Sequence, residues 1–561
     1  MNRHATAVIS ATGVLTYRGL HQRAERYRSA LAQAGLCAGD VLAIALPDGQ
    51  DAVAALLAAL RSGTPFTWLT ADLPAERQEA VIADCAPRAV LTSPGTRYAD
   101  LPVVQVMGDD IDVVRQASPS RAAEVPKNTE YLVYTSGSTG LPKGIAQRSG
   151  NLDHLTRWLG TAIRADEKSR LLQWARLGYD AAYVEILTAL HAGAALVVPP
   201  GEVKADAARL HEWITRHEVT HVQTVPSLLR HLLNVEADAV GGVRALSLFG
   251  ESLRAGLVHE GRARFPNAVV HNFYGPTECI LATWQRVPEP AADPISLGEA
   301  IPGRRILLTD DDGAEVGAGE IGEIRVRSVF LAHGYLNRPW ETERAFLHGD
   351  VYRTGDLARR TPEGRLVFVG RSDDQVKIRG ARVDLGEIEA ALARDPAVAQ
   401  AAVKVYGESQ ESLRPAAYVV ARPEAVIDTP ALHRRLALAL PTYMVPAAYV
   451  VLTEMPLTPS GKVDRQRLPD PERDTRPVEF GTDTERGLAR IWCEVIGCER
   501  AGPDDDFFAI GGYSLLAPQV MAEVLERFGV DLPVRAVFDR PILRELAAHI
   551  DHAPAGREEE S

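Results

Sequence analysis

The sequence has few of the residues that mark a disulfide scaffold or a metal site. Its 561 residues include five cysteines, which are scattered at Cys37, Cys85, Cys279, Cys493 and Cys498. An odd, scattered set does not suggest a disulfide framework. Cys493 and Cys498 have neither the spacing nor the accompanying histidines of a zinc site. A reduced, cytoplasmic setting fits this cysteine usage best.

Long apolar runs and an excess of positive charge are also missing. The opening residues, Met-Asn-Arg-His-Ala, have no apolar signal-peptide core, and no later run approaches the length of a membrane span. Lysine and arginine number 61 against 74 aspartate and glutamate residues, which gives a net charge of −13. We therefore expect neither nucleic acid nor an anionic membrane as the main partner.

What is present is typical of a large globular protein with several domains. Hydrophobic residues make up 46% and charged residues 24% of the chain, and 561 residues are too many for one core. Helical and strand patterns alternate from residue 13 to residue 130, with a helix expected over 17–35, a strand over 41–46 and a helix over 51–62. This alternation predicts an α/β fold around a largely parallel sheet.

A glycine-rich loop follows the predicted buried strand Tyr131–Tyr134. Its hydroxyls and glycines can surround an anion, and Lys143 adds a positive charge. The loop residues are Thr135, Ser136, Gly137, Ser138, Thr139, Gly140, Lys143 and Gly144. It is not the common P-loop, since Lys143 precedes a glycine and not Ser or Thr. The pattern predicts a polyphosphate-binding loop; the alternative is a flexible surface loop.

This loop resembles the phosphate-loop signature of the adenylate-forming superfamily, which includes acyl-CoA synthetases, luciferases and the adenylation domains of nonribosomal peptide synthetases. The resemblance implies a large multi-sheet α/β core over 1–370 and a small, mobile α+β subdomain over 371–470. The catalytic residues that it implies are Thr139, Lys143, Glu278 and Lys462.

Further motifs match the nucleotide-binding elements of that superfamily. By resemblance, Tyr274 packs on the adenine, Asn272 meets its amino edge, and Glu278 holds Mg²⁺, which proteins usually bind through one or two carboxylates. Asp356 is expected to accept hydrogen bonds from the ribose. The remaining residues implied for ATP or AMP are Gly275, Thr277 and Arg371. Asp373 is implied as the hinge.

Asp180 favours an amino acid as the substrate. Taken alone, a carboxylate at a helix start is most often a cap. In the amino-acid-activating members that this chain resembles, however, the aspartate at this place binds the α-ammonium group. The side-chain pocket implied by the resemblance is lined by Asp180, Ala181, Val184, Thr224, Ser247, Phe249, Phe273, Leu281 and Ala282. Because only Asp180 is charged there, we expect a neutral, small to medium, alanine-like substrate, with an aromatic or cyclic one as the runner-up.

A second, smaller domain is expected after a polar linker at 471–482. Thr482-Asp-Thr-Glu485 is a capping-box pattern, and three amphipathic helices over 483–552 predict an all-α bundle. The stretch Phe507–Leu516 resembles the phosphopantetheine site of a peptidyl carrier domain, with Ser514 as the attachment residue. Residues 553–561 are expected to be a disordered tail.

The resemblances together imply a stand-alone loading module that activates an amino acid with ATP and Mg²⁺ and holds it on 4′-phosphopantetheine. The implied partners are a phosphopantetheinyl transferase and a downstream condensation, ketosynthase or tailoring enzyme; an MbtH-like activator is a further candidate. Two alternatives stay open. One is an acyl- or aryl-acid adenylating enzyme with a fused carrier. The other is a catalytically degenerate carrier scaffold.

Overall fold

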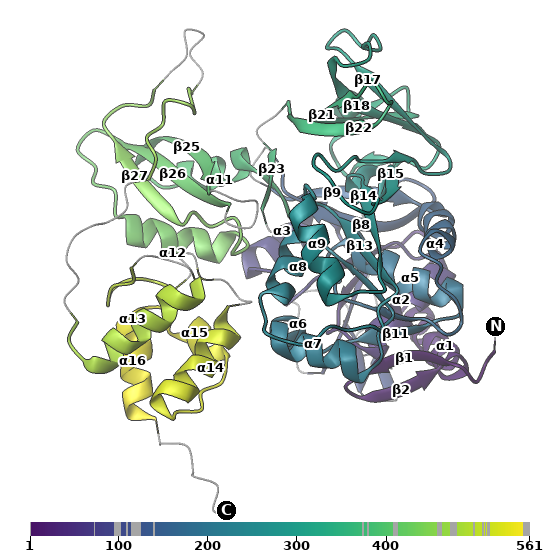
Figure 1. Ribbon diagram of the computed structural model, residues 1–561, viewed down its shortest axis with the longest axis horizontal. Helices are drawn as coiled ribbons and strands as arrows, with labels where there is room; N and C mark the ends of the chain where they lie inside the picture. Colours follow the sequence, from purple (N-terminus) through teal and green to yellow (C-terminus); the bar gives the residue numbers. More distant parts are fainter. Residues whose placement is uncertain are drawn as a thin grey trace, which may run out of the picture. The chain divides into compact units, whose positions relative to one another are not determined.

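The computed structural model describes residues 2–71, 73–94, 103–107, 110–113, 125–137, 141–372, 375–378, 381–407, 413–456, 463–471, 480–496, 500–507, 510, 512 and 516–553. They form two compact units, and the first of these ends at Val383 (Figure 1). The domain boundaries expected from the sequence, after residues 370, 470, 482 and 552, stay predictions.

The first unit contains a nine-stranded sheet whose centre is parallel, as the sequence predicts. Strands β14, β13, β12, β10, β11 and β1 run parallel to one another, and β16, β15 and β2 add antiparallel edges. In sheet order the strands are β16 (Glu299–Ala300), β15 (Thr283–Arg286), β14 (Val269–Tyr274), β13 (Ala245–Phe249), β12 (His221–Thr224), β10 (Arg170–Leu172), β11 (Ala195–Val198), β1 (Thr6–Ser10) and β2 (Gly13–Thr16).

A second, eight-stranded sheet carries the predicted phosphate loop between two of its strands. In sheet order it contains β19 (Gly334–Tyr335), β9 (Lys143–Arg148), β8 (Thr129–Thr135), β4 (Phe66–Trp68), β3 (Leu42–Ala45), β5 (Ala89–Thr92), β6 (Val103–Met107) and β7 (Asp110–Val113). The predicted strands at 41–46 and 131–134 are confirmed as β3 and β8.

Helices connect these strands along the chain. Up to residue 345 they are α1 (Tyr17–Gln33), α2 (Gln50–Ser62), α3 (Ala75–Cys85), α4 (Asn151–Ala162), α5 (Asp180–Ala192), α6 (Gly201–Lys204), α7 (Ala207–Arg216), α8 (Pro226–Leu233), α9 (Ala255–Arg264), the short 3₁₀ helix η1 (Thr277–Cys279) and α10 (Pro339–Ala345). The predicted helices at 17–35 and 51–62 are confirmed as α1 and α2.

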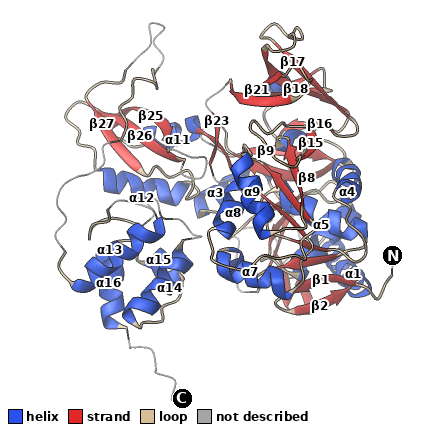
Figure 2. Cartoon of the chain, viewed as in Figure 1, coloured by secondary structure: helices blue, strands red, loops and turns tan. Residues whose placement is uncertain are grey.

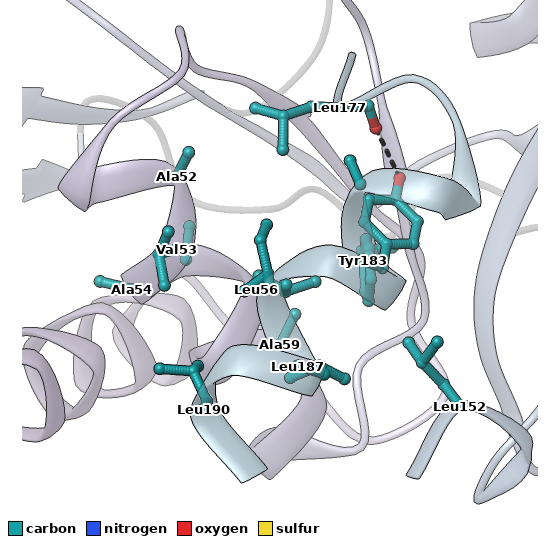
Figure 3. Packing of buried hydrophobic residues seen from close by; sticks show 14 of the residues in the cluster. Ala52, Val53, Ala54, Leu56, Ala59, Leu152, Leu177, Tyr183, Leu187 and Leu190 are labelled. Atoms are coloured by element: carbon teal, nitrogen blue, oxygen red, sulfur yellow. Dashed lines mark hydrogen bonds between the residues drawn. The ribbon is translucent and has the colours of Figure 1, made fainter. Parts of the chain in front are cut away.

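Figure 3 shows where α2, α4 and α5 share one buried cluster. Leu56 of α2, Leu152 of α4 and Leu187 of α5 are 5% exposed or less. The hydroxyl of Tyr183, in the same cluster, donates to the carbonyl of Leu177 at 2.8 Å. This hydrogen bond and the packing fix the start of α5, which carries Asp180.

A five-stranded sheet and a hairpin complete the first unit. The sheet contains β17 (Arg304–Thr309), β18 (Ile321–Ser328), β20 (Phe346–Leu347), β21 (Val351–Arg360) and β22 (Leu366–Arg371). The hairpin pairs β23 (Gln375–Ile378) with β24 (Ala381–Asp384). Asp373, the predicted hinge, lies outside the described residues.

The second unit begins with an α+β subdomain, as the resemblance implies. A three-stranded sheet and two helices form it: α11 (Leu385–Ala393), β25 (Val398–Tyr406), β26 (Arg414–Ala421), α12 (Thr429–Ala439) and β27 (Ala448–Leu452). Asp384 caps α11 by accepting a hydrogen bond from the backbone N–H of Gly386 at 3.0 Å.

The described residues from 480 onward form helices joined by loops, as Figure 2 shows. The helices are α13 (Asp483–Ile496), α14 (Ala517–Phe528), α15 (Arg535–Asp539) and α16 (Leu543–His552). The bundle therefore has a fourth, short helix, α15, in addition to the three predicted. Trp492 and Phe507 are fully buried in its core, with ring centres 5.3 Å apart.

The capping box predicted at the start of α13 forms with one change of partner. The hydroxyl of Thr482 accepts from the backbone N–H of Glu485 at 3.0 Å, as expected. The Glu485 carboxylate accepts from the N–H of Gly481, at 2.6 Å, and not from that of Thr482.

Candidate active site

The predicted phosphate loop joins β8 to β9, where Thr135 pairs with Lys143 across the hairpin. A Cβ at Gly137 would lie 2.5 Å from the carbonyl oxygen of Leu141, so the turn requires glycine there. The Lys143 side chain is 10% exposed, and its ammonium lies 3.8 Å from the centre of the Tyr335 ring. Ser138 and Thr139 lie outside the described residues.

Glu278 is a fully buried carboxylate that forms an ion pair with the guanidinium group of Arg382. It lies in η1, directly after β14, and is 0% exposed. Tyr335 donates to its Oε1 at 2.8 Å, and Arg382 donates to both carboxylate oxygens at 3.2 Å. Burial alone would raise the pKa of Glu278, but the charges of Arg382 and Lys143 hold that pKa below its ordinary value. The residue therefore fits a site for Mg²⁺.

Asp356 is a second buried carboxylate with a tyrosine donor and an arginine partner. Tyr274 donates to its Oδ2 at 2.7 Å, and Arg371 forms an ion pair with Oδ1. The Gln375 side-chain oxygen accepts from Arg371 at 2.9 Å and from Arg382 at 2.6 Å. A continuous chain of polar contacts therefore runs from Asp356 to Glu278.

Arg382, Gln375 and Lys377 are site residues that the sequence reasoning missed. All three come from the β23–β24 hairpin. The Arg382 carbonyl also accepts from the hydroxyl of Ser136 in the phosphate loop, at 2.7 Å. Burial lowers the pKa of the Lys377 amine, and the charge of Asp356 opposes that change. A signal was present in the sequence, since Gln375 and Lys377 alternate as residues on one face of a strand do.

Two further nucleotide-motif residues are fixed by the backbone around β14. The Asn272 amide donates to the carbonyl of Ser296 at 2.8 Å and is 4% exposed. A Cβ at Gly275 would lie 2.5 to 2.8 Å from backbone atoms of Leu281 and Ala282. Glycine at 275 is therefore what lets the segment 281–282 lie against the end of β14.

Asp180 lies beside Glu278 and keeps one oxygen without a partner. It is the first residue of α5, and Tyr179 occupies the N-cap position, so Asp180 is not the N-cap. Thr277 and the backbone N–H of Ala181 bond its carboxylate, but Oδ2 is buried with no partner among the described residues. Burial, and then the charge of Glu278, raise the pKa of Asp180 to about 7.

The structure brings several of the predicted pocket residues together. Val184, Phe273 and Leu281 belong to one buried cluster, and Phe249 packs at its edge. Phe249 and Phe273 are register partners on β13 and β14. Ala282 instead packs with Tyr274, in the cluster on the nucleotide side. That all nine predicted residues line one cavity stays a prediction.

In the helical bundle, Gly512 lies close against Phe507. The Gly512 N–H donates to the Phe507 carbonyl at 2.8 Å, and a Cβ at Gly512 would lie 2.5 Å from the Phe507 ring and carbonyl oxygen. Ser514 itself, like Lys462 of the small subdomain, lies outside the described residues.

The described part of the chain shows no helix long and apolar enough to cross a membrane. It also holds no group of three or more His, Cys, Asp or Glu side chains arranged for a metal ion.

Family models match three consecutive parts of the chain. They are an AMP-binding enzyme over residues 1–336, an AMP-binding enzyme C-terminal domain over 387–462, and a phosphopantetheine attachment site over 486–550. Phosphinothricin tripeptide synthetase PhsB of Streptomyces viridochromogenes is 38% identical over 96% of this chain and 47% of its own length. The chain spans 7%, 47% and 23% of the first three curated relatives.

Other relatives have this chain's length. Novobiocin biosynthesis protein H of Streptomyces niveus is 34% identical over 97% of this chain and 93% of its own length. The solved structure of PA1221, described as a nonribosomal peptide synthetase protein with adenylation and carrier domains, is 29% identical with a TM-score of 0.79, over 98% of this chain and 95% of its own. This chain therefore belongs to the AMP-binding enzymes, as an ATP-dependent adenylation domain of the nonribosomal peptide synthetase type followed by a phosphopantetheine carrier domain.

Proposed function

We propose that this chain activates an α-amino acid as its aminoacyl adenylate, releases pyrophosphate, and passes the aminoacyl group to phosphopantetheine on Ser514 as a stand-alone loading module. The observation that favours an amino acid as the substrate is the environment of Asp180. Its Oδ2 is buried without a partner among the described residues, and an α-ammonium group supplies a hydrogen bond and a positive charge there. A fatty or aryl acid would leave that oxygen unsatisfied.

The proposed adenylation half-reaction needs positioning and charge, and no covalent nucleophile in the protein. The substrate carboxylate attacks the α-phosphate of ATP, and pyrophosphate leaves. Lys143 lies at the end of the phosphate loop, beside Tyr335, where its charge balances the phosphates. Lys462, from the small subdomain, is proposed to stabilise the charge on the α-phosphate, and Thr139 to bind the leaving phosphates.

Glu278 is the proposed Mg²⁺ ligand, because its carboxylate already accepts a guanidinium group. Bound Mg²⁺ would neutralise charge on the phosphates. Asp356 and Arg371 are proposed to bind the ribose, and Tyr274 to pack on the adenine. Asp356 holds the Tyr274 ring through a hydrogen bond of 2.7 Å, so sugar and base recognition depend on one carboxylate.

The test is amino-acid-dependent exchange of pyrophosphate into ATP, measured over a panel of amino acids and of fatty and aryl acids. We expect a neutral amino acid of small to medium size to support exchange. Exchange with acids that lack an amino group would favour the acyl- or aryl-acid alternative. ATP binding without exchange for any acid would favour the degenerate scaffold.

The carrier domain needs a phosphopantetheinyl transferase and a downstream partner of the nonribosomal peptide type. We propose that this partner is a condensation, ketosynthase or tailoring enzyme, and that an MbtH-like protein acts as an activator. Mass measurement of the intact chain after incubation with coenzyme A and a transferase, then with ATP and the amino acid, tests loading on Ser514. Activation of exchange by an added MbtH-like protein tests the second partner.

A further inference from the structure

Three neighbouring strands of the nine-stranded sheet carry a row of buried polar side chains. In the parallel register Gln223 of β12 pairs with Ser247 of β13, and Ser247 pairs with His271 of β14. Their exposed fractions are 2%, 1% and 3%. Because side chains alternate along a strand, the row shares its face of the sheet with Phe249 and Phe273, two residues further on. We call these three residues the polar row.

Two atoms of the polar row have no hydrogen-bond partner within the described part of the chain. They are the side-chain nitrogen of Gln223 and the hydroxyl of Ser247. Oδ2 of Asp180, in the predicted side-chain pocket, shares this condition. Buried polar groups are nearly always bonded, so several unsatisfied ones at a candidate pocket indicate groups that a ligand satisfies.

His271 completes the polar row as an uncharged donor. The indole N–H of Trp284 donates to its Nδ1 at 3.0 Å, so the ring proton of neutral His271 is on Nε2. Burial, and then the charge of Arg286, lower the pKa of His271 to about 4, so the ring is neutral at pH 7. Arg286, its register partner on β15, is exposed.

Aromatic rings border the row and limit which substrates fit. Trp158 lies edge-on to Phe273 at 6.4 Å and to Trp284 at 5.9 Å between ring centres. Apolar rings beside neutral hydrogen-bonding groups suit a side chain with an apolar body and a polar, uncharged end. A charged end would need a counter-charge, and the polar row contains none.

We propose that Gln223, Ser247 and His271 recognise a hydroxyl or carboxamide group on the side chain of the amino-acid substrate. This inference rests on the proposed function and narrows it, since alanine would leave the polar row unsatisfied. Ser247 was already among the predicted pocket residues, whereas Gln223 and His271 are new specificity determinants.

Pairs of amino acids with similar shape give the sharpest test. The ratio of kcat/KM in pyrophosphate exchange is measured for threonine against valine, serine against alanine, glutamine against methionine, and tyrosine against phenylalanine. We expect the best substrate to be a polar member and to exceed its apolar partner by about tenfold or more, because an apolar analogue leaves buried groups unpaired. An apolar best substrate, or equal rates within its pair, overturns the inference while the proposed function stands. Absence of exchange with every amino acid overturns the proposed function.

Substitutions then test whether the polar row causes the preference for a polar substrate. Ser247→Ala and Gln223→Met should each lower the polar-to-apolar ratio severalfold toward one, chiefly by slowing the polar substrate. Thr309→Val is the matched control, because Thr309 also has a buried hydroxyl without a partner among the described residues but lies on β17 of another sheet. Calorimetric binding of the same amino acids gives the ratio even where a variant no longer turns over. An unchanged ratio in both row variants, or an equal fall in Thr309→Val, overturns the assignment.

Discussion

Replacing Asp180 with asparagine should make the substrate-free protein more stable and inactive at the same time. The carboxylate is placed where burial and the neighbouring charge of Glu278 oppose its ionisation, and its Oδ2 has no partner among the described residues. Asparagine keeps nearly the same shape and stays neutral at every pH. The substitution therefore removes the cost of the buried charge together with the proposed partner of the substrate's ammonium group.

The size of the effect follows from the pKa. In the folded protein the pKa of Asp180 is about 7, against 3.8 for an ordinary aspartate. A difference of about three pH units corresponds to at most about 4 kcal/mol. Since Asp180 is only partly buried as a whole residue, solvent screens part of this, and we expect about 2 kcal/mol.

The pH dependence has a definite sign. Because the folded pKa lies above the unfolded one, the carboxyl costs no stability below about pH 3.8. Its cost grows as the pH rises from there and is complete above about pH 7. The gain from Asp180→Asn should therefore be largest near pH 8 and about half as large near pH 5.5.

Scanning calorimetry measures this gain, with pyrophosphate exchange as the second readout. We expect the melting temperature of Asp180→Asn to rise by about 2 to 4 °C at pH 8, and amino-acid-dependent exchange to be lost. Asp153→Asn serves as a control, since Asp153 is exposed and paired with Arg157, and it should not show this gain. A variant that melts lower than the wild type at pH 8, or a gain that does not change with pH, would refute the assignment of Asp180.

Three other variants test separate parts of the chain. Arg382→Gln leaves the carboxylate of Glu278 buried without its guanidinium, which should lower the free energy of unfolding by about 3 kcal/mol in scanning calorimetry without Mg²⁺. The control is Arg305→Gln, which breaks an exposed ion pair with Glu315 and should cost almost nothing. Equal losses of stability in the two variants would contradict the role of Arg382. Ser514→Ala should keep pyrophosphate exchange but gain no phosphopantetheine mass, whereas Lys462→Ala should show the reverse; a loaded Ser514→Ala protein would remove the carrier assignment. Asp373→Pro fixes one backbone angle at the predicted hinge, so one half-reaction should fall far more than the other, and an equal fall of both in a folded protein would argue against a hinge there.

Most of the fold prediction came from the spacing of apolar residues within short segments. The alternation of apolar residues was enough to place α1, α2, β3 and β8, because each of these elements buries one face or both. The short helix α15 escaped prediction because five residues are too few to show a helical period.

The sequence predicted those candidate-site residues that belong to a recognisable motif. It missed those that reach the site only through contacts between distant parts of the chain. Glu278, Asp356 and Asp180 come from recognisable stretches, and the structure brings Glu278 and Asp180 together through Thr277. Arg382 could not be identified in this way, because its ion pair joins positions 104 residues apart in the sequence. Gln223 and His271 were missed because only the register of three parallel strands aligns them with Ser247.

Ligand binding replaces existing contacts in one half of the candidate site and adds new hydrogen bonds in the other half. On the nucleotide side the carboxylates already have cationic partners, since Arg382 pairs with Glu278 and Arg371 with Asp356. In the proposed function Mg²⁺ binds Glu278 and the ribose binds Asp356, so both ligands would replace contacts that these carboxylates now make to the arginines. On the amino-acid side, the unsatisfied atoms of Asp180 and Ser247 are buried, so a substrate adds hydrogen bonds without breaking any of theirs. Selectivity should consequently be decided mainly on the amino-acid side, where a wrong group leaves a buried atom unpaired. Affinity for nucleotide and Mg²⁺ should instead depend on how readily Arg371 of β22 and Arg382 of β24 release the two carboxylates.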